Sequence, residues 1–229
     1  MKSLDPKYIP ILEEKYGSYW WPVEYPEEIS EDPFKNLIIT VLSQNTSEIN
    51  CLRAYKGLSA KFEVKPEVLA KAKAENIKQA IRSGGLYNVK SKRIRELSEA
   101  VIEKFGGDLS SVLSLPKEEA RKKLMELPGI GKKTADVLLA QRHSYAEVMV
   151  VDTHMDRIAK RIGLVKPDAK YDDIQKALQV FIPWEKGERT AGLFWLLAKY
   201  TCRARNPKCY DCPIIELCDY GNKTISKKQ

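Results

Sequence analysis

Residues 127–139 read LPGIGKKTADVLL, which indicates two short helices joined by a tight turn. Gly129 and Gly131 permit positive φ angles and let the backbone of another molecule approach closely. The turn leaves N–H groups at the start of the second helix, and together with the helix dipole they form a site for one anion, such as a phosphate. The pattern predicts a helix-hairpin-helix that grips a DNA backbone through Gly129, Ile130 and Gly131 without reading the bases.

Two lysines follow the turn directly. An ordinary helical hairpin explains the two glycines, because glycine turns are common in such hairpins. It does not explain Lys132 and Lys133, which stand where the helix dipole disfavours a cation. The dipole favours the neutral amine there, and a free amine is what a Schiff-base nucleophile requires. Either lysine can be that nucleophile for this reason, and the other is then a phosphate contact or a solvated side chain.

A carboxylate, Asp152, follows a short apolar run at residues 147–151. It either caps the next helix or serves a chemical role. Thr153 and Asp156 have the spacing of a capping box, so we expect Thr153 to cap that helix and to leave Asp152 free. We expect His154 to pack or hydrogen-bond locally, because no residue near it has the spacing of a metal ligand.

Four of the five cysteines form a C-x6-C-x2-C-x5-C pattern near the end of the chain. Cys51 stands apart among apolar residues, and we expect it to be buried. The N-terminus lacks the apolar segment of a secretory signal, so we expect a reducing compartment, where clustered thiols bind metals. The spacing suits structural zinc and an iron–sulfur cluster equally well. The four candidate ligands are Cys202, Cys209, Cys212 and Cys218.

Positive charge is concentrated in the loop between the first two of these cysteines and exceeds negative charge over the whole chain. Arg203, Arg205 and Lys208 form either a second phosphate grip or a solubilising surface. The 229 residues carry a formal net charge of +8, which suits a nucleic acid partner but also an ordinary basic protein. No apolar run approaches the roughly 18–20 residues of a membrane span, so no membrane partner is expected.

The apolar periodicity of the remaining chain is helical. Residues 34–46, FKNLIITVLSQNT, suit a buried helix, and residues 88–105 suit another that ends at two glycines. The apolar run at 147–151 is too short and isolated to found a sheet. We therefore expect an all-α protein, and we expect the aromatic residues at 19–21 to lie in its core.

Together these motifs resemble the endonuclease III family of base excision DNA glycosylases. LPGIGKKTADVLL, VDTHMDRI, YTCRARNPKCYDCPIIELC, DPFKNLIITVLSQNT and GLYNVKSKRIREL carry the resemblance. It implies a two-lobed, all-α helix-hairpin-helix glycosylase fold with a C-terminal [4Fe–4S] loop module. One lobe is a helical barrel of residues 34–134 that ends in the hairpin. The other joins residues 1–33 to 135–229, carries the catalytic aspartate and holds the cluster at 202–218, with the DNA-binding cleft between the lobes.

The resemblance also implies roles for single residues. Lys133 falls on the family's nucleophilic lysine and Asp152 on its catalytic aspartate, which implies lyase activity beside base removal. Leu86 falls on the residue that wedges into the duplex. The family fills the gap left by the flipped base with a glutamine, but here an ungapped alignment puts Asn45 at that position, directly after Gln44.

The implied function is that of a monomeric, bifunctional DNA glycosylase/AP lyase. We expect it to remove oxidised pyrimidines from double-stranded DNA and to cleave 3′ to abasic sites by β-elimination, in a prokaryotic nucleoid or a eukaryotic nucleus. The alternatives are a T/G or U/G mismatch glycosylase, a non-enzymatic protein that recognises DNA structure, and a zinc-stabilised interaction protein. The pairing of Lys133 with Asp152 argues against a pure binding protein, which needs neither.

Overall fold

A computed structural model describes residues 2–19, 26–140, 148–183 and 187–226, and every regular element in these ranges is a helix. The predicted all-α class is therefore confirmed. No helix in that part of the chain is long and apolar enough to cross a bilayer. The chain divides into two compact units, one of residues 24–143 and one of residues 1–23 with 144–229. The first unit extends beyond the predicted barrel, 34–134, at both ends.

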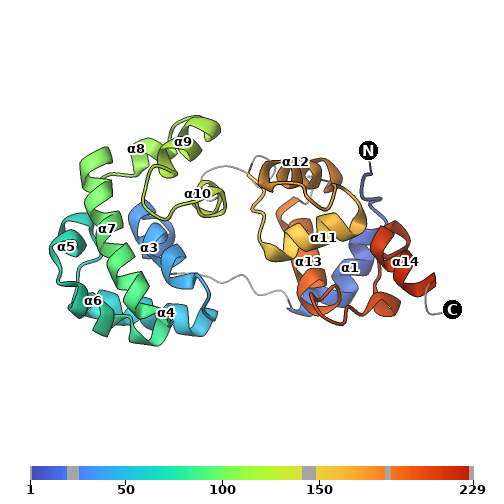
Figure 1. Cartoon of the computed structure of the whole chain (residues 1–229), viewed down its shortest axis with the longest axis horizontal. Coiled ribbons are helices and arrows are strands. Elements are labelled where there is room, and N and C mark those ends of the chain that lie inside the picture. Colours follow the sequence, from blue (N-terminus) through green and yellow to red (C-terminus); the bar gives the residue numbers. More distant parts are fainter. Residues whose placement is uncertain (1, 20–25, 141–147, 184–186, 227–229) are drawn as a thin grey trace. The chain divides into compact units, whose positions relative to one another are not determined.

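The unit of residues 24–143 is a group of helices around the long helix α7, which packs against α3, α5 and α6 (Figure 1). Its elements are α2 (Glu27–Ser30), α3 (Pro33–Ser43), α4 (Glu48–Lys61), α5 (Pro66–Lys71), α6 (Ala74–Ala80), η2 (Arg82–Gly84), α7 (Tyr87–Phe105), α8 (Ser110–Leu113), α9 (Lys117–Leu124) and α10 (Lys132–Leu139).

The sequence of helix α3 explains why this helix forms and why its residues lie in the core of the unit. The Asp32 carboxylate caps the helix by accepting hydrogen bonds from the backbone N–H groups of Phe34 (2.9 Å) and Lys35 (3.1 Å). Pro33 follows the cap, at a position where its missing N–H is not needed. The apolar side chains that follow are almost completely buried: Leu37, Ile38, Ile39, Val41 and Leu42.

The second unit joins the N-terminal helix to the C-terminal third of the chain. Helix α1 packs against α13, and α11 packs against α12, α13 and α14 (Figure 1). The core includes Phe181 and Phe194, whose rings meet edge to face with centroids 5.6 Å apart. The elements are α1 (Tyr8–Tyr16), η1 (Gly17–Tyr19), α11 (Thr153–Ile162), α12 (Tyr171–Phe181), α13 (Gly187–Tyr200), η4 (Cys209–Asp211), η5 (Ile215–Leu217) and α14 (Asp219–Ser226).

Two predictions about burial have different outcomes. Cys51 is completely buried, as predicted, and burial raises the pKa of its thiol to about 11. The prediction that the aromatic segment lies in the core is wrong for Tyr19, which is 46% exposed and packs its ring on that of Tyr200. Trp20 and Trp21 lie outside the described residues.

Candidate functional site

The predicted hairpin is formed by α9 and α10, and its two glycines have different roles. Gly129 has a φ of +75°, and a Cβ atom there would come within 2.7 Å of the Arg93 Nε atom. Any other residue at this position would therefore be strained. Gly131 has an ordinary φ of −97°, and a Cβ atom there would meet nothing within 4 Å. The outer face of the turn is thus open at Gly131, whereas the Ile130 side chain is buried.

A buried ion pair holds the two helices of the hairpin together. Arg121 on α9 donates from Nε and Nη2 to the two carboxylate oxygens of Asp136 on α10, at 2.8 and 2.9 Å. Asp136 is completely buried and Arg121 nearly so. Sequence reasoning missed this pair, although an acid inside the apolar run ADVLL was a signal, because a charge that is buried needs a partner.

The start of α10 carries the two predicted lysines. Gly131 offers no side-chain cap, and the first turn of the helix contains no acid. Lys133 is exposed and Lys132 is half-buried. The helix start thus presents backbone N–H groups and a solvent-facing amine, which suits an anionic ligand.

The residues predicted to insert into DNA lie in two turns of the same unit. Leu86 precedes α7, is 55% exposed and has a φ of +45°, an unusual conformation for a bulky residue. Asn45, in the turn between α3 and α4, is also exposed and left-handed, with a φ of +53°. The neighbouring Gln44 is half-buried, and its Oε1 accepts a hydrogen bond from Arg93 Nη1 at 2.9 Å. The Asn45 side chain is therefore the more exposed of the pair.

In the other unit, the Asp152 carboxylate is held at both oxygens. Its Oδ1 accepts hydrogen bonds from the backbone N–H groups of His154 (2.9 Å) and Met155 (2.8 Å), and so caps α11. Its Oδ2 accepts from the Trp195 indole Nε1 at 2.9 Å. Trp195 lies on α13, far away in the chain, and no sequence signal connects it to Asp152.

The predicted capping box at Thr153 and Asp156 is wrong. The cap lies one residue earlier than that prediction requires, so Thr153 is the first residue of the helix and Asp152 is the cap. A carboxylate oxygen can accept two N–H bonds at once, which favours it in this position. Asp156 instead forms an ion pair with Lys160 at 2.8 Å.

The local role predicted for His154 is confirmed. Its Nδ1 lies 3.1 Å from Arg157 Nη2, and its ring packs on Trp195 with centroids 5.4 Å apart.

The middle and the C-terminal end of α11 hold the first part of the cysteine loop, which we define as residues 202–218. Arg157 Nε donates to the carbonyl of Cys202 at 2.9 Å. Arg161 donates from Nη1 to the carbonyl of Arg203 (2.7 Å) and to Cys202 Sγ (3.3 Å), and from Nη2 to the carbonyl of Ala204 (3.2 Å). Helix α11 therefore connects Asp152 at its start to the cysteine loop near its end.

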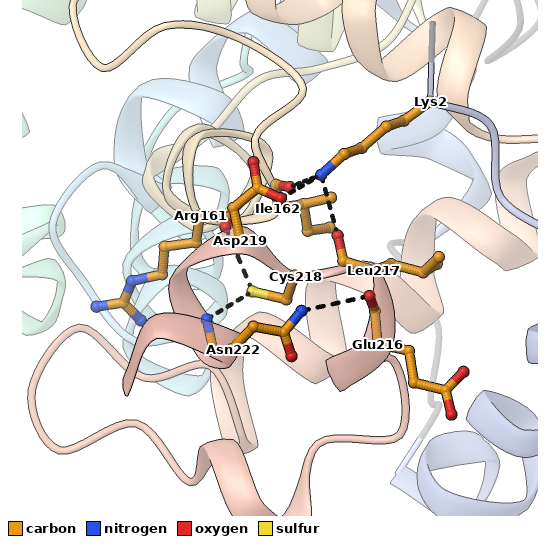
Figure 2. A network of polar contacts seen from close by, with 9 residues as sticks. Lys2, Arg161, Ile162, Glu216, Leu217, Cys218, Asp219 and Asn222 are labelled. Atoms are coloured by element: carbon orange, nitrogen blue, oxygen red, sulfur yellow. Dashed lines mark hydrogen bonds and ion pairs between the residues drawn. The ribbon is translucent and has the colours of Figure 1, made fainter. Parts of the chain in front are cut away.

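The last cysteine of the loop is fixed by a second network (Figure 2). Cys218 Sγ donates to the carbonyl of Arg161 and accepts from the N–H of Gly221, both at 3.3 Å. Lys2 Nζ donates to the carbonyls of Ile162 (2.6 Å) and Leu217 (3.3 Å) and to the carboxylate of Asp219 (2.6 Å). The N-terminal segment thus ties the end of α11 to this loop.

Each of the four cysteines of the pattern is buried or half-buried. Burial raises the pKa of the Cys212 thiol to about 12, and the Cys218, Cys202 and Cys209 thiols are close enough to raise it further. Within the described ranges, no group of three or more His, Cys, Asp or Glu side chains is arranged to hold a metal ion. The donor set nevertheless fits an iron–sulfur cluster, because it comprises four neighbouring thiols, of which Cys202 receives a guanidinium hydrogen bond and Cys218 a backbone N–H hydrogen bond.

The cationic side chains of the loop face solvent. Arg203, Arg205 and Lys208 are all exposed, and Arg203 Nη2 donates to the carbonyl of Asn206 at 3.0 Å. The same loop whose backbone is held by α11 therefore presents three cations outward.

Comparisons with known proteins identify the family of the chain. Residues 38–183 match the family model of the HhH-GPD superfamily of base excision DNA repair proteins. Endonuclease III of Bacillus subtilis is 31% identical over 98% of this chain and 97% of its own, and that of Thermotoga maritima is 35% identical over 82% and 84%. A trapped Endonuclease III–DNA covalent intermediate is structurally similar, with a TM-score of 0.74, 29% identity and coverage of 96% of both chains. With its hairpin, aspartate and four cysteines in the same chain, the protein belongs to the endonuclease III family of the HhH-GPD superfamily.

Proposed function

We propose that this protein is a bifunctional DNA glycosylase/AP lyase of base excision repair that removes oxidised pyrimidines from duplex DNA and cleaves 3′ to abasic sites. The observation that carries the proposal is the exposed Lys133 amine at the uncapped start of α10, beside the open face of Gly131. The structural similarity to an Endonuclease III that was trapped covalently on DNA supports it.

In this proposal the hairpin and the cysteine loop hold the DNA backbone. The backbone of residues 129–131 and the Lys132 side chain bind one phosphate, while Arg203, Arg205 and Lys208 bind others. Leu86 enters the base stack beside the flipped nucleotide, and Asn45 or Gln44 fills the gap that the nucleotide leaves. The exposure of Leu86 and Asn45 supports these roles.

Lys133 is the proposed nucleophile. Its neutral amine attacks C1′ of the sugar, the C1′–N bond to the base breaks, and the base leaves with a proton. Opening of the sugar ring gives an imine between Lys133 and C1′. The imine acidifies the C2′ proton, and loss of this proton expels the 3′ phosphate by β-elimination. Asp152 supplies a negative charge that stabilises the cationic sugar, and it accepts a proton from the lysine.

We further propose that Cys202, Cys209, Cys212 and Cys218 hold a [4Fe–4S] cluster. When bound, it would cross-link the loop and so fix the outward direction of the three cations. The neighbouring positions of four buried or half-buried cysteines and the N–H bond to Cys218 Sγ support the assignment. Iron and acid-labile sulfide analysis of protein made anaerobically with ample iron checks it. We expect about four irons for the four thiolate ligands, and zinc in their place would contradict it.

A panel of lesion-bearing duplexes tests the proposed activity. Duplexes with thymine glycol, a T/G mismatch, a U/G mismatch or an abasic site are incubated with the protein, with and without borohydride. We expect base release and strand cleavage on thymine glycol, cleavage at the abasic site, and a reduced covalent adduct with both. Release from T/G or U/G mismatches alone would support the mismatch glycosylase instead. Binding without cleavage of any duplex would leave only a DNA-structure-binding protein.

A further inference from the structure

Lys90, on the first turn of α7, is a buried lysine that the proposed chemistry does not use. Its side chain is almost completely inaccessible to solvent, at 3% exposure. In the described part of the chain no carboxylate forms an ion pair with it, and burial lowers the pKa of its ammonium group. A buried ammonium without an anionic partner is unfavourable unless it donates to well-placed acceptors.

The Lys90 ammonium joins two segments that are far apart in the sequence. Nζ donates to the carbonyl of Leu42 at 2.7 Å and to the carbonyl of Gly84 at 2.9 Å. Leu42 belongs to the last turn of α3, where carbonyl groups lack helical partners and favour a cation. Gly84 ends η2, and its carbonyl also accepts the Thr46 hydroxyl at 2.6 Å. The two turns are therefore tied together directly and through Lys90.

Each of the two carbonyls lies just before a residue that we propose to insert into DNA. The α3–α4 turn continues from Leu42 to Gln44 and Asn45, and the η2–α7 turn continues from Gly84 to Leu86. Asn45 and Leu86 both have positive φ angles, and this conformation is strained for a bulky residue such as Leu86. Such conformations persist only where the surrounding contacts over-determine them. Lys90 and Thr46 supply contacts of that kind at both turns.

The η2 segment has little freedom to shift by itself. A Cβ atom on Gly84 would come within 2.8 Å of the Ala54 side chain, and one on Gly57 within 2.2 Å of the Ala80 carbonyl. Gly84 and Gly57 thus allow η2 and α6 to pack closely against α4. The position of the α3–α4 turn relative to this packed segment then depends on the hydrogen bonds that join the two.

We propose that Lys90 is a positioning residue for DNA insertion, whose ammonium sets the spacing between the turn that carries Gln44 and Asn45 and the turn that carries Leu86. This inference rests on the proposed function, and it assigns Lys90 no contact with DNA. It predicts that removal of the ammonium impairs opening of a duplex but leaves the covalent chemistry of Lys133 intact.

The test compares Lys90→Met with wild-type protein in three assays. In a duplex with an uncleavable tetrahydrofuran abasic analogue opposite 2-aminopurine, we expect the fluorescence rise on binding to be largely abolished. In single-turnover base release from duplex thymine glycol, we expect a decrease of about tenfold or more, because small misplacements carry large rate penalties. In β-elimination at an abasic site in single-stranded DNA, where no partner strand is displaced, we expect a rate within about twofold of wild type.

Two further variants keep the result interpretable. Lys92→Met removes an exposed lysine of the same helix and changes the net charge equally, so it controls for weaker general attraction to DNA. Thr46→Val removes one of the two donors to the Gly84 carbonyl and leaves Lys90, so it should show a smaller decrease in the same two duplex assays. If Lys90→Met fails to fold, Thr46→Val carries the test.

The inference is overturned if Lys90→Met, or Thr46→Val where Lys90→Met does not fold, keeps the full fluorescence change and duplex rate, or if its single-stranded and duplex rates fall equally. The 2-aminopurine assay involves no chemistry, so it remains decisive if wild-type protein fails to cleave any lesion. In that case the proposed function fails while the positioning role is still judged by insertion.

Discussion

At the scale of single residues, Asp152 caps a helix and is also the proposed catalytic carboxylate. Oδ1 is used by the start of α11, and Oδ2 is held by the indole of Trp195. These hydrogen bonds fix the orientation of the carboxylate. A preorganised charge of this kind is what stabilisation of a cationic sugar requires. Capping and the proposed catalytic role are therefore compatible at this residue, and variants must be designed to separate them.

Asp152→Asn should slow base release by about 10²–10³-fold, because the amide keeps the shape of the side chain but lacks its charge. Its Oδ1 can still cap α11, so we expect the melting temperature to fall by only a few degrees, corresponding to a destabilisation of about 1 kcal/mol. Single-turnover kinetics on duplex thymine glycol and a thermal melt check both values.

Trp195→Phe is the matched control for that variant. It removes the hydrogen bond to Oδ2 but keeps the aromatic ring and the carboxylate charge. A rate much nearer to wild type than that of Asp152→Asn is expected. A lower melting temperature with an unchanged rate in Asp152→Asn would show that the aspartate is only a helix cap.

Local sequence patterns identified some of the candidate site residues but not those whose partners are distant in sequence. Gly131, Lys133 and Leu86 stand in contiguous motifs, so they could be singled out as candidate site residues from short stretches of sequence, and the structure shows all three exposed. Trp195 was missed because its partner is brought to it only by the packing of α13 on α11. The capping error arose because hydroxyl and carboxylate caps share one sequence signature at adjacent positions.

At the scale of elements, the two glycines of the hairpin have different expected effects: Gly129 on stability and Gly131 on the proposed DNA binding. Gly131→Ala should change the unfolding free energy by no more than about 1 kcal/mol, because φ is ordinary and the space is open. Affinity for duplex DNA should nevertheless fall, since the new methyl group stands where we propose a phosphate approaches. Urea unfolding and fluorescence anisotropy at fixed salt measure the two effects.

Gly129→Ala is the paired variant with the opposite expectation. Alanine at this position should lower the unfolding free energy by about 1–3 kcal/mol, because its Cβ atom is strained at a positive φ and would lie too close to the Arg93 side chain. Equal DNA affinity of Gly131→Ala and wild-type protein would show that the open face of the turn does not bind the backbone.

The buried ion pair between α9 and α10 is expected to be important for the stability of the hairpin. Arg121→Met should lower the unfolding free energy by about 3–5 kcal/mol, because it leaves the Asp136 charge buried without its guanidinium. The double variant Arg121→Met with Asp136→Leu should be less destabilised, since no buried charge remains. Urea unfolding decides the order, and a double variant that is less stable than Arg121→Met would contradict it.

The helices themselves could be predicted well, whereas this ion pair could not. Apolar periodicity and glycine turns identified α3, α7 and the hairpin, because these signals act within one or two helical turns. The pairing of Arg121 with Asp136 depends on how α9 folds back on α10. The charged sequence of α9 indicates a solvated helix and does not distinguish Arg121 from its neighbours.

At the scale of the whole molecule, a spread of positive charge is proposed to hold a polyanion. Changing Arg203, Arg205 and Lys208 together to Ala should lower DNA affinity and reduce the slope of log affinity against log salt by about 0.9 for each phosphate that the loop no longer neutralises. The reduction should be equal on damaged and undamaged duplexes, because phosphates carry no information about the lesion. Binding titrations at several salt concentrations measure the slope.

The state of the cysteine loop is the control for that titration. Iron content equal to wild type shows that the variant lacks the cations but keeps the folded loop. An unchanged slope with equal iron would assign the grip to the hairpin alone.

The motifs spread over the chain made the family and the all-α fold predictable from sequence. The long-range ties of Lys2 and Arg161 to the loop were not, because they join segments that are distant in sequence.

The proposed covalent bond between Lys133 and the sugar is tested most directly by mapping the adduct. Wild-type protein is reacted with a thymine glycol duplex, reduced with borohydride and digested, and the modified peptide is sequenced by mass spectrometry. We expect the sugar remnant on Lys133, no adduct with Lys133→Gln although that variant still binds DNA, and a normal adduct with Lys132→Gln. An adduct on Lys132, or a full adduct yield from Lys133→Gln, would contradict the assignment of Lys133 as the nucleophile.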